Sequence, residues 1–157
     1  MASTSIEWQR RRWLALPLWL AISAAWAQPA GTSEWVDVWK RPACGDCKDW
    51  VTHPESIGFK MRTDDDGNTA ARQRPGVLVR LGACHTASIG GCAFEGHAPA
   101  GDIRRLLTDR PAAIGLAMTA MPVGSPGMDG PAYGQRRDPD DMLRVAKDGS
   151  ATTYQRD

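Results

Sequence analysis

The chain has 157 residues and a formal net charge of +1, because 19 Lys and Arg residues nearly balance 18 Asp and Glu residues. This near-neutral balance gives no electrostatic reason to expect a nucleic acid or an anionic membrane surface as partner. A small ligand is favoured instead.

Residues 1–27 have the pattern of an export signal. Three arginines at positions 10–12 precede fourteen uncharged residues, 13–26, and Ala25-Trp26-Ala27 forms a small-residue cleavage pattern. A membrane-spanning helix needs roughly 20 apolar residues, so the run is short for an anchor. We therefore expect a periplasmic protein, cleaved after Ala27, with no membrane partner in its mature form. An uncleaved anchor is the alternative, and the arginines suit either general or twin-arginine export.

Residues 28–157 are enough for one compact domain and too few for two. Three arginines and one acid leave with the signal, so the formal net charge of this part is −1. All four cysteines remain in it. Structural disulfides are one explanation for them in an oxidising compartment, and a functional site is the other.

The first half of this domain predicts a strand, a cysteine turn, a helix and a second strand. Alternation over residues 35–39 predicts the first strand, and a helix from Cys44 is expected to end at His53-Pro54. Residues 58–63 suit the second strand, and the acidic run 64–68 suits a turn. Asn68 is expected to cap a short helix that reaches Arg74.

The second half predicts a hairpin, a helix, a long loop and a final strand pair. Residues 77–81 fit either a strand or a loop. The remaining expected segments are strands 86–89 and 92–95 around Gly90-Gly91, helix 100–108, an irregular loop 113–131, and strands within 142–147 and 151–154. This order predicts an α/β domain with a mixed sheet and flanking helices.

Cys44-Gly45-Asp46-Cys47 is the sharpest chemical feature. Residues three apart at the start of a helix point the same way, and the helix N-terminus favours thiolates. The pair could clamp a metal or exchange electrons as a disulfide, and its spacing does not decide between these roles.

The hairpin register predicts a third cysteine near a histidine. Counting outward from the glycine turn places Cys84 opposite His97, within the short separation of a cross-strand pair. Alternation assigns Cys92 to the apolar face, as a small core residue. His85 falls on the face opposite Cys84 unless the strand starts after it, so its role as a ligand stays open.

Three methionines, Met118, Met121 and Met128, fall in the predicted irregular loop. Methionine commonly fills gaps in a core. Thioethers are also soft ligands suited to Cu(I), so these side chains are candidate ligands as well.

The sequence resembles the periplasmic metal-binding family catalogued as domain of unknown function 411, which includes copper-resistance proteins. The resemblance covers most of the mature chain. It rests on Cys44-Gly45-Asp46-Cys47, on Ala83-Cys84-His85-Thr86-Ala87, on the segment from Glu95 to Leu107 and on the segment from Gly115 to Met128.

This resemblance implies a thioredoxin-like fold and a role in handling copper or a related soft metal. It implies metal ligands at Cys44, Cys47 and Cys84, and extends to His85, His97, Met121 and Met128. Asp46 and Cys92 are departures, because family members commonly have a further cysteine at the first position and an apolar or aromatic residue at the second.

The leading hypothesis is a Cu(I)-binding protein that works with other copper-handling proteins, rather than an enzyme. Three cysteines and one histidine would also suit zinc. A thioredoxin-like thiol-disulfide oxidoreductase is the rival. Such enzymes usually have tryptophan before the first cysteine and a proline loop facing it, whereas this chain has Ala43 and offers Cys84. A disulfide-stapled interaction domain without metal is a weaker third hypothesis.

Overall fold

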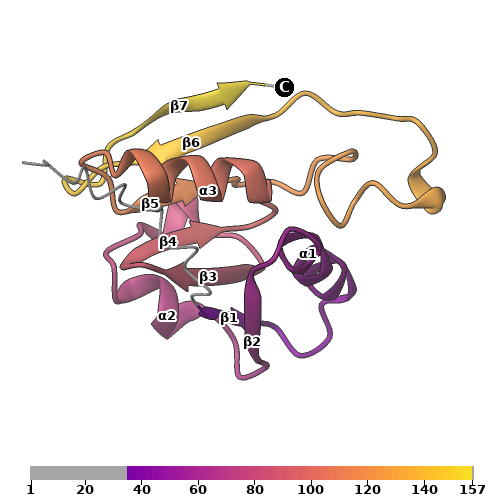
Figure 1. The fold of residues 1–157 in the computed structure, drawn as a ribbon, viewed down its shortest axis with the longest axis horizontal. Helices are drawn as coiled ribbons and strands as arrows, with labels where there is room; N and C mark the ends of the chain where they lie inside the picture. Colours follow the sequence, from indigo (N-terminus) through magenta and orange to yellow (C-terminus); the bar gives the residue numbers. More distant parts are fainter. Residues whose placement is uncertain (1–34, 157) are drawn as a thin grey trace, which may run out of the picture. The chain divides into compact units, whose positions relative to one another are not determined.

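The computed structural model describes residues 35–156, which form a mixed α/β domain around one seven-stranded sheet (Figure 1). The strands are Trp35–Lys40 (β1), Lys60–Asp64 (β2), His85–Ile89 (β3), Cys92–Glu95 (β4), Gly115–Ala117 (β5), Asp141–Val145 (β6) and Ala151–Arg156 (β7). The helices are Gly45–Ser56 (α1), Thr69–Gln73 (α2) and Ala100–Asp109 (α3), with 3-10 turns at Val79–Leu81 (η1) and Pro131–Tyr133 (η2). The predicted export signal lies outside the described residues.

The strand order across the sheet is β2-β1-β3-β4-β5-β6-β7. The β1–β2 and β4–β5 pairs are parallel, and the other neighbouring pairs are antiparallel. The prediction of an α/β domain with a mixed sheet is therefore confirmed. β2 and β7 form its two edges.

The β3–β4 hairpin turns at Gly90-Gly91, as predicted. Ile89 pairs with Cys92 and Ala87 with Phe94. The register prediction is confirmed, because a two-residue glycine turn fixes the pairing locally. This hairpin lies in the middle of the sheet and carries the sequence around Cys84 and His97 at its open end.

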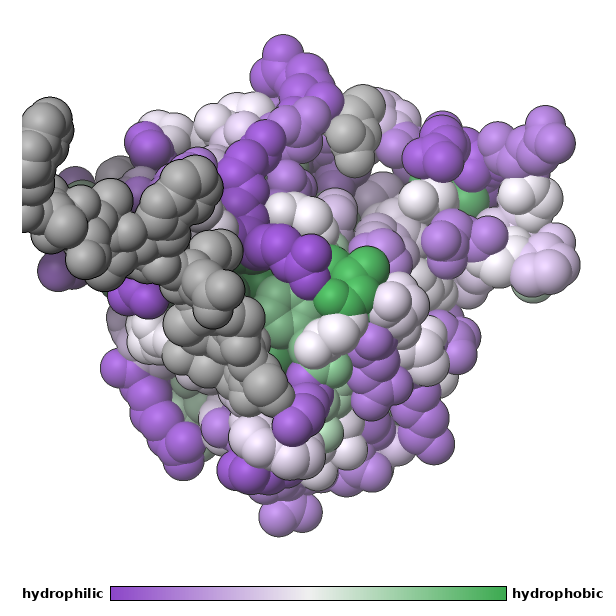
Figure 2. Space-filling view, viewed as in Figure 1, coloured by the Kyte–Doolittle hydropathy of each residue, from purple (hydrophilic) through white to green (hydrophobic). Residues whose placement is uncertain are grey.

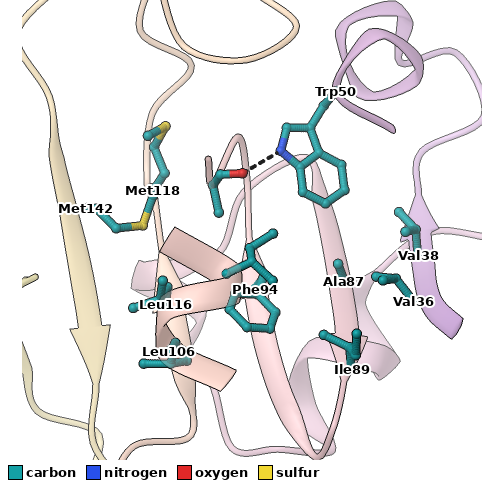
Figure 3. Close-up of a cluster of buried hydrophobic side chains, with 12 residues drawn as sticks. Val36, Val38, Trp50, Ala87, Ile89, Phe94, Leu106, Leu116, Met118 and Met142 are labelled. Atoms are coloured by element: carbon teal, nitrogen blue, oxygen red, sulfur yellow. Dashed lines mark hydrogen bonds between the residues drawn. The ribbon is translucent and has the colours of Figure 1, made fainter. Parts of the chain in front are cut away.

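The core occupies both faces of the sheet. Trp50 of α1 and Ile103 of α3 pack in one cluster with Phe94 and Leu116, so both helices cover the same face (Figure 3). Ala93 precedes Phe94 in β4 and faces the other side of the sheet, where it belongs to a second cluster. The other buried members are Val77, Leu81, Ala117 and Val145, and η1 helps to cover this cluster. Segment 77–81, open between strand and loop, thus contains a 3-10 turn.

The predicted end of α1 at His53-Pro54 is wrong, because the helix continues to Ser56 with Pro54 inside it. Pro54 lies in the last turn, where the missing N–H removes one helical hydrogen bond, and its carbonyl still accepts from the amides of Ile57 and Phe59. The buried proline ring contributes to packing rather than ending the helix.

Asn68 is the N-cap residue of α2, as predicted, but its side chain makes no capping hydrogen bond. The amide instead donates to the carbonyl of Ala83 and to Oγ1 of Thr86, at 3.1 and 3.2 Å. Asn68 therefore ties α2 to the segment that precedes β3.

The predicted irregular loop 113–131 contains a strand that the sequence did not indicate. β5 has only three residues, too few for an alternating pattern. It forms because it inserts between β4 and β6, where the Ala93 amide donates to the Ile114 carbonyl and the Ile114 amide donates to the Val145 carbonyl. The rest of the connection from β5 to β6 loops out from the sheet (orange in Figure 1).

On the face drawn in Figure 2, hydrophilic residues cover most of the coloured surface and apolar residues gather in a small central area. Within residues 35–156, no helix has the length and apolar character needed to cross a bilayer.

Candidate metal centre

The first part of the site is the N-terminal end of α1. Cys44 is the N-cap residue, and its Sγ accepts a hydrogen bond from the backbone amide of Cys47 at 3.3 Å. The two cysteines are joined in a disulfide. They therefore sit as predicted at a helix start, in the oxidised state, and need reduction before they can serve as thiolate ligands.

Cys84 is the centre of the cluster. It lies just before β3, and its Sγ is 3.2 Å from Sγ of Cys47. Three further donor atoms surround it: Nδ1 of His85 at 3.5 Å, Sδ of Met121 at 3.7 Å and Nε2 of His97 at 4.0 Å. Segments from three distant parts of the chain thus meet at one thiol.

The predicted closeness of Cys84 and His97 is confirmed, but the face assignment behind it is wrong. The β3–β4 ladder ends at Thr86 and Glu95, and Gly96, with a φ of +68°, turns the chain. A side chain at Gly96 would collide with the carbonyl oxygen of Met118. Because of this turn, His97 comes to the α1 side of the sheet while Glu95 faces α2.

His97 is held in one orientation by a backbone carbonyl. Its Nδ1 donates to the carbonyl oxygen of Pro126 at 2.8 Å, which leaves Nε2 as the nitrogen with a free lone pair. Such a hydrogen bond on the second ring nitrogen is typical of metal-binding histidines. Nε2 is the nitrogen that faces Cys84.

His85 lies beneath the cluster. Its ring packs against Trp50 with centroids 4.4 Å apart, and against His97 at 5.5 Å. Trp50 is fixed in turn, because its indole N–H donates to the carbonyl of Ala98 (dashed in Figure 3). Nε2 of His85 is buried and has no hydrogen-bond partner among residues 35–156.

Burial keeps both imidazoles neutral and makes the thiol a weaker acid. Desolvation, with a smaller contribution from the charge of His97, lowers the pKa of His85 to about 3. The pKa of His97 is also lowered by burial. Burial raises the pKa of Cys84, an effect that the nearby Arg41 opposes.

A buried polar network on the α2 side supports the segment that carries Cys84. Glu95 is fully buried and accepts hydrogen bonds from Arg72, Thr86 and the backbone amide of Ala83. Arg72 also donates to the carbonyl of Ala83, at 2.7 Å. Both backbone groups of the residue before Cys84 are therefore held by this ion pair.

The long loop closes the site from the other side. Gly127 has a φ of +82° and packs so tightly on α1 that an added Cβ would lie 2.7 Å from the backbone nitrogen of Trp50. This close approach sets the position of the neighbouring Pro126 carbonyl. The carboxylate of Asp46 accepts a hydrogen bond from the hydroxyl of Tyr133 at 3.3 Å.

The structure brings six of the seven predicted ligands together. Met121 is 43% exposed and contacts Cys84, whereas Met118 is buried in the core. Met128 is half-buried, and among the described residues no hydrogen bond joins its sulfur to the cluster. Cys92 is a free cysteine that packs against the core on the predicted apolar face and is half-buried there.

Two overlapping groups of donor atoms follow from this arrangement. Within each group the candidate ligand atoms all lie within 4.8 Å of one another. The groups are Cys44, Cys47 and Cys84, and Cys84, His85 and His97. This cysteine and histidine cluster could hold a metal ion, because sulfur and imidazole are ligands for copper and zinc.

Sequence reasoning missed the groups that hold the ligands in place. The Pro126 carbonyl has no side-chain signal at all, and the Arg72–Glu95 pair joins residues 23 positions apart on different elements. The one hint in the sequence was the position of Glu95. It follows Phe94 in a strand with neighbours on both sides, where an acidic side chain needs a partner.

Comparisons with known proteins agree with this geometry. The family described as "Protein of unknown function, DUF411" matches residues 81–128. Two solved structures, titled copper resistance protein copG Form 1 and Form 2, are each 38% identical to this chain with a TM-score of 0.72. They cover 78% and 79% of this chain, and 96% and 98% of their own. No curated protein matches the chain.

Proposed function

The chain belongs to the DUF411 family, and from this membership and the buried sulfur and imidazole cluster we propose that it binds Cu(I) in copper handling or resistance. The single observation that carries the proposal is Cys84, whose sulfur lies within 4.0 Å of two sulfurs and two imidazole nitrogens. Soft sulfur donors select Cu(I) over hard cations. The similar copG structures, which are titled copper resistance proteins, support copper as the metal.

The donor set fits a soft metal ion. Cys44, Cys47 and Cys84 would supply thiolates after reduction of the Cys44–Cys47 disulfide, and His97 would supply Nε2. His85 would offer Nδ1, the ring nitrogen that lies 3.5 Å from Sγ of Cys84. A bound metal ion would be held by cysteine side chains in their deprotonated, thiolate form. The protein supplies neutral imidazoles, a fixed tautomer and a water-poor surrounding.

Zinc is the competing metal, since thiolates and imidazole also suit tetrahedral Zn²⁺. Anaerobic titration of the reduced protein with each metal, using a chromogenic competitor suited to each, would separate the two. We expect Cu(I) to remain bound when equimolar zinc is added. Displacement of Cu(I) by zinc would make zinc, rather than copper, the proposed metal.

The test of the site itself is a set of four cysteine variants in competition with a chromogenic Cu(I) chelator. Cys44→Ser, Cys47→Ser and Cys84→Ser should each weaken Cu(I) binding at least about tenfold, because each removes a thiolate from a small ligand set. Cys92→Ala is the matched control, and it should bind copper as the unaltered protein does.

A thiol-disulfide oxidoreductase is the second candidate function. Sγ of Cys84 lies 3.2 Å from Sγ of Cys47, so the Cys84 thiolate, after its proton passes to solvent, could attack Cys47. The Cys47–Cys84 bond would form as the Cys44–Cys47 bond breaks and Cys44 leaves as the thiolate. The helix N-terminus would stabilise that thiolate. Disulfide reductase activity that is lost in Cys44→Ser, together with Cu(I) affinity that survives Cys84→Ser, would favour this function over metal binding.

We extend the proposal to fold family and compartment. The order of strand, cysteine pair at a helix start, and further strands supports a thioredoxin-like fold. The pattern of residues 1–27 supports export to the periplasm with cleavage before Gln28. There, other copper-handling proteins would be its partners. Mass spectrometry of the exported protein tests the cleavage, and a mass that retains residues before Gln28 would contradict it.

A further inference from the structure

The cluster is nearly closed to solvent. Cys47, His85 and His97 have no exposed surface, Cys84 is 6% exposed, and Cys44 is half-buried at the start of α1. A metal ion that binds there must pass a less buried point. Cys84 and Met121 both line a cavity of about 430 Å³ that opens to the surface. We call this space the Cys84 cavity.

Met121 is suited to be the first contact for an arriving ion. It is 43% exposed, yet its sulfur lies 3.7 Å from Sγ of Cys84. A thioether carries no proton and binds Cu(I) as a neutral ligand at any pH. An ion held by Met121 would therefore need to move only a few ångströms to reach the buried thiol.

The wall of the Cys84 cavity is cationic. Arg41 and Arg72 line it, and no acidic side chain is among its described lining residues. The charge of Arg72 is already paired with the buried carboxylate of Glu95. The guanidinium of Arg41, in contrast, has no hydrogen-bond or ion-pair partner within residues 35–156. Such a wall repels a bare cation and attracts an anion, because a cleft of one sign of charge concentrates ligands of the other.

We propose that the Cys84 cavity is the port through which copper enters and leaves, and that it takes Cu(I) as a small anionic complex, with Arg41 attracting the carrier and Met121 receiving the ion. This inference rests on the proposed copper binding. In the exchange, the bond from copper to the carrier breaks as bonds to Met121 and then Cys84 form. Copper stays Cu(I), and the Cys84 proton passes to the departing carrier or to solvent.

Removal of copper follows the same path in reverse, so the rate of extraction tests the port. The full chain is reduced, loaded with Cu(I) under anaerobic conditions, and mixed with excess bathocuproine disulfonate, which is anionic, or neocuproine, which is neutral. Absorbance of the coloured complex gives each rate constant. The ratio of the two rate constants isolates the effect of charge, because a change in copper affinity would alter both.

We expect Arg41→Gln to lower the ratio of anionic to neutral extraction rates about threefold to tenfold at low salt, and Arg41→Lys to restore most of it. Added salt should lower the ratio for the unaltered protein in the same direction. Arg144→Gln is the matched control, an exposed arginine of β6 that does not line the cavity. Met121→Leu should slow extraction by both chelators.

The outcomes separate the two proposals. A protein that takes up no Cu(I) would overturn both the copper function and the port. Copper uptake with a ratio that is the same in Arg41→Gln, Arg144→Gln and the unaltered protein would overturn the port alone. Faster loss of copper in Met121→Leu by both chelators would show that Met121 blocks exit rather than guiding it, and would also overturn the port.

Discussion

At the scale of single residues, the histidines are the most unusual groups in the molecule. His85 is completely buried against Trp50 and His97, and its pKa is lowered to about 3. A histidine with this property is a neutral nitrogen ligand across the whole physiological range. It also makes the metal-free fold sensitive to acid.

The sign of this sensitivity follows from proton linkage. The unfolded chain has a histidine pKa of about 6.5, so below that pH the unfolded state binds a proton that native His85 does not. The metal-free protein should therefore lose stability as pH falls from about 6.5 to 3, by a total on the order of 4 kcal/mol. Urea unfolding in the presence of a chelator, at several pH values, measures this loss.

His85→Gln removes the titrating group and should give a flatter dependence of unfolding free energy on pH. His53→Gln, at a half-buried position of α1 outside the cluster, serves as the control and should keep the original slope. An identical slope in His85→Gln would mean that another group controls the acid sensitivity.

At the scale of elements, β4 and α2 are joined by the buried Arg72–Glu95 ion pair, which also holds the residue before Cys84. Arg72→Met leaves the Glu95 carboxylate buried without its cation, and removing one partner of a buried pair typically costs about 3 kcal/mol. We expect that loss in urea unfolding, together with weaker Cu(I) binding.

Arg62→Met is the matched control for Arg72→Met, because Arg62 pairs with Asp37 on the exposed edge of the sheet. Exposed pairs contribute about 1 kcal/mol or less. Adding Glu95→Gln to Arg72→Met removes the unpaired charge and should recover part of the lost stability. Equal costs for the two single arginine variants would show that the buried pair does not support this segment.

The long loop depends on α1 through Gly127. Gly127→Ala adds a Cβ 2.7 Å from the backbone nitrogen of Trp50, in a conformation that already disfavours side chains. Gly76→Ala shares the positive φ, at +88°, but meets nothing within 4 Å. We expect the control to lose about 1 kcal/mol and Gly127→Ala to lose at least about 2 kcal/mol more.

Gly127→Ala should also loosen the hydrogen bond from His97 to Pro126, which nitrogen NMR of the imidazole detects as a mixture of tautomers. A single tautomer in Gly127→Ala would mean that the Pro126 carbonyl holds its place without this contact. The same measurement in Gly76→Ala should match the unaltered protein.

How far the sequence predicts these features depends on how local their causes are. The hairpin register follows from Gly90-Gly91 alone, and it brought Cys84 to His97 correctly. The faces beyond the ladder could not be counted, because Gly96 turns the chain and Cys84 precedes β3. The three-residue β5 and the Arg72–Glu95 pair depend on segments far apart in sequence, so neither had a local signal.

At the scale of the whole molecule, the oxidation state of one cysteine pair should decide whether metal can stabilise the fold. The Cys44–Cys47 disulfide engages two of the three proposed thiolates, so only the reduced protein offers the full ligand set. A ligand that binds the native state stabilises it by about 4 kcal/mol at a free concentration of 1,000 times its Kd.

We therefore expect Cu(I) to raise the Tm of the reduced protein by about 10 °C and to leave the Tm of the oxidised protein nearly unchanged. Differential scanning calorimetry under anaerobic conditions, with copper buffered by a chelator, measures both states. Cys92→Ala should repeat the pattern, because Cys92 lies outside both donor groups. Equal stabilisation of the oxidised and reduced proteins would show that copper binds without the Cys44 and Cys47 thiolates, since a disulfide is a poor ligand and only Cys84, the histidines and Met121 would remain.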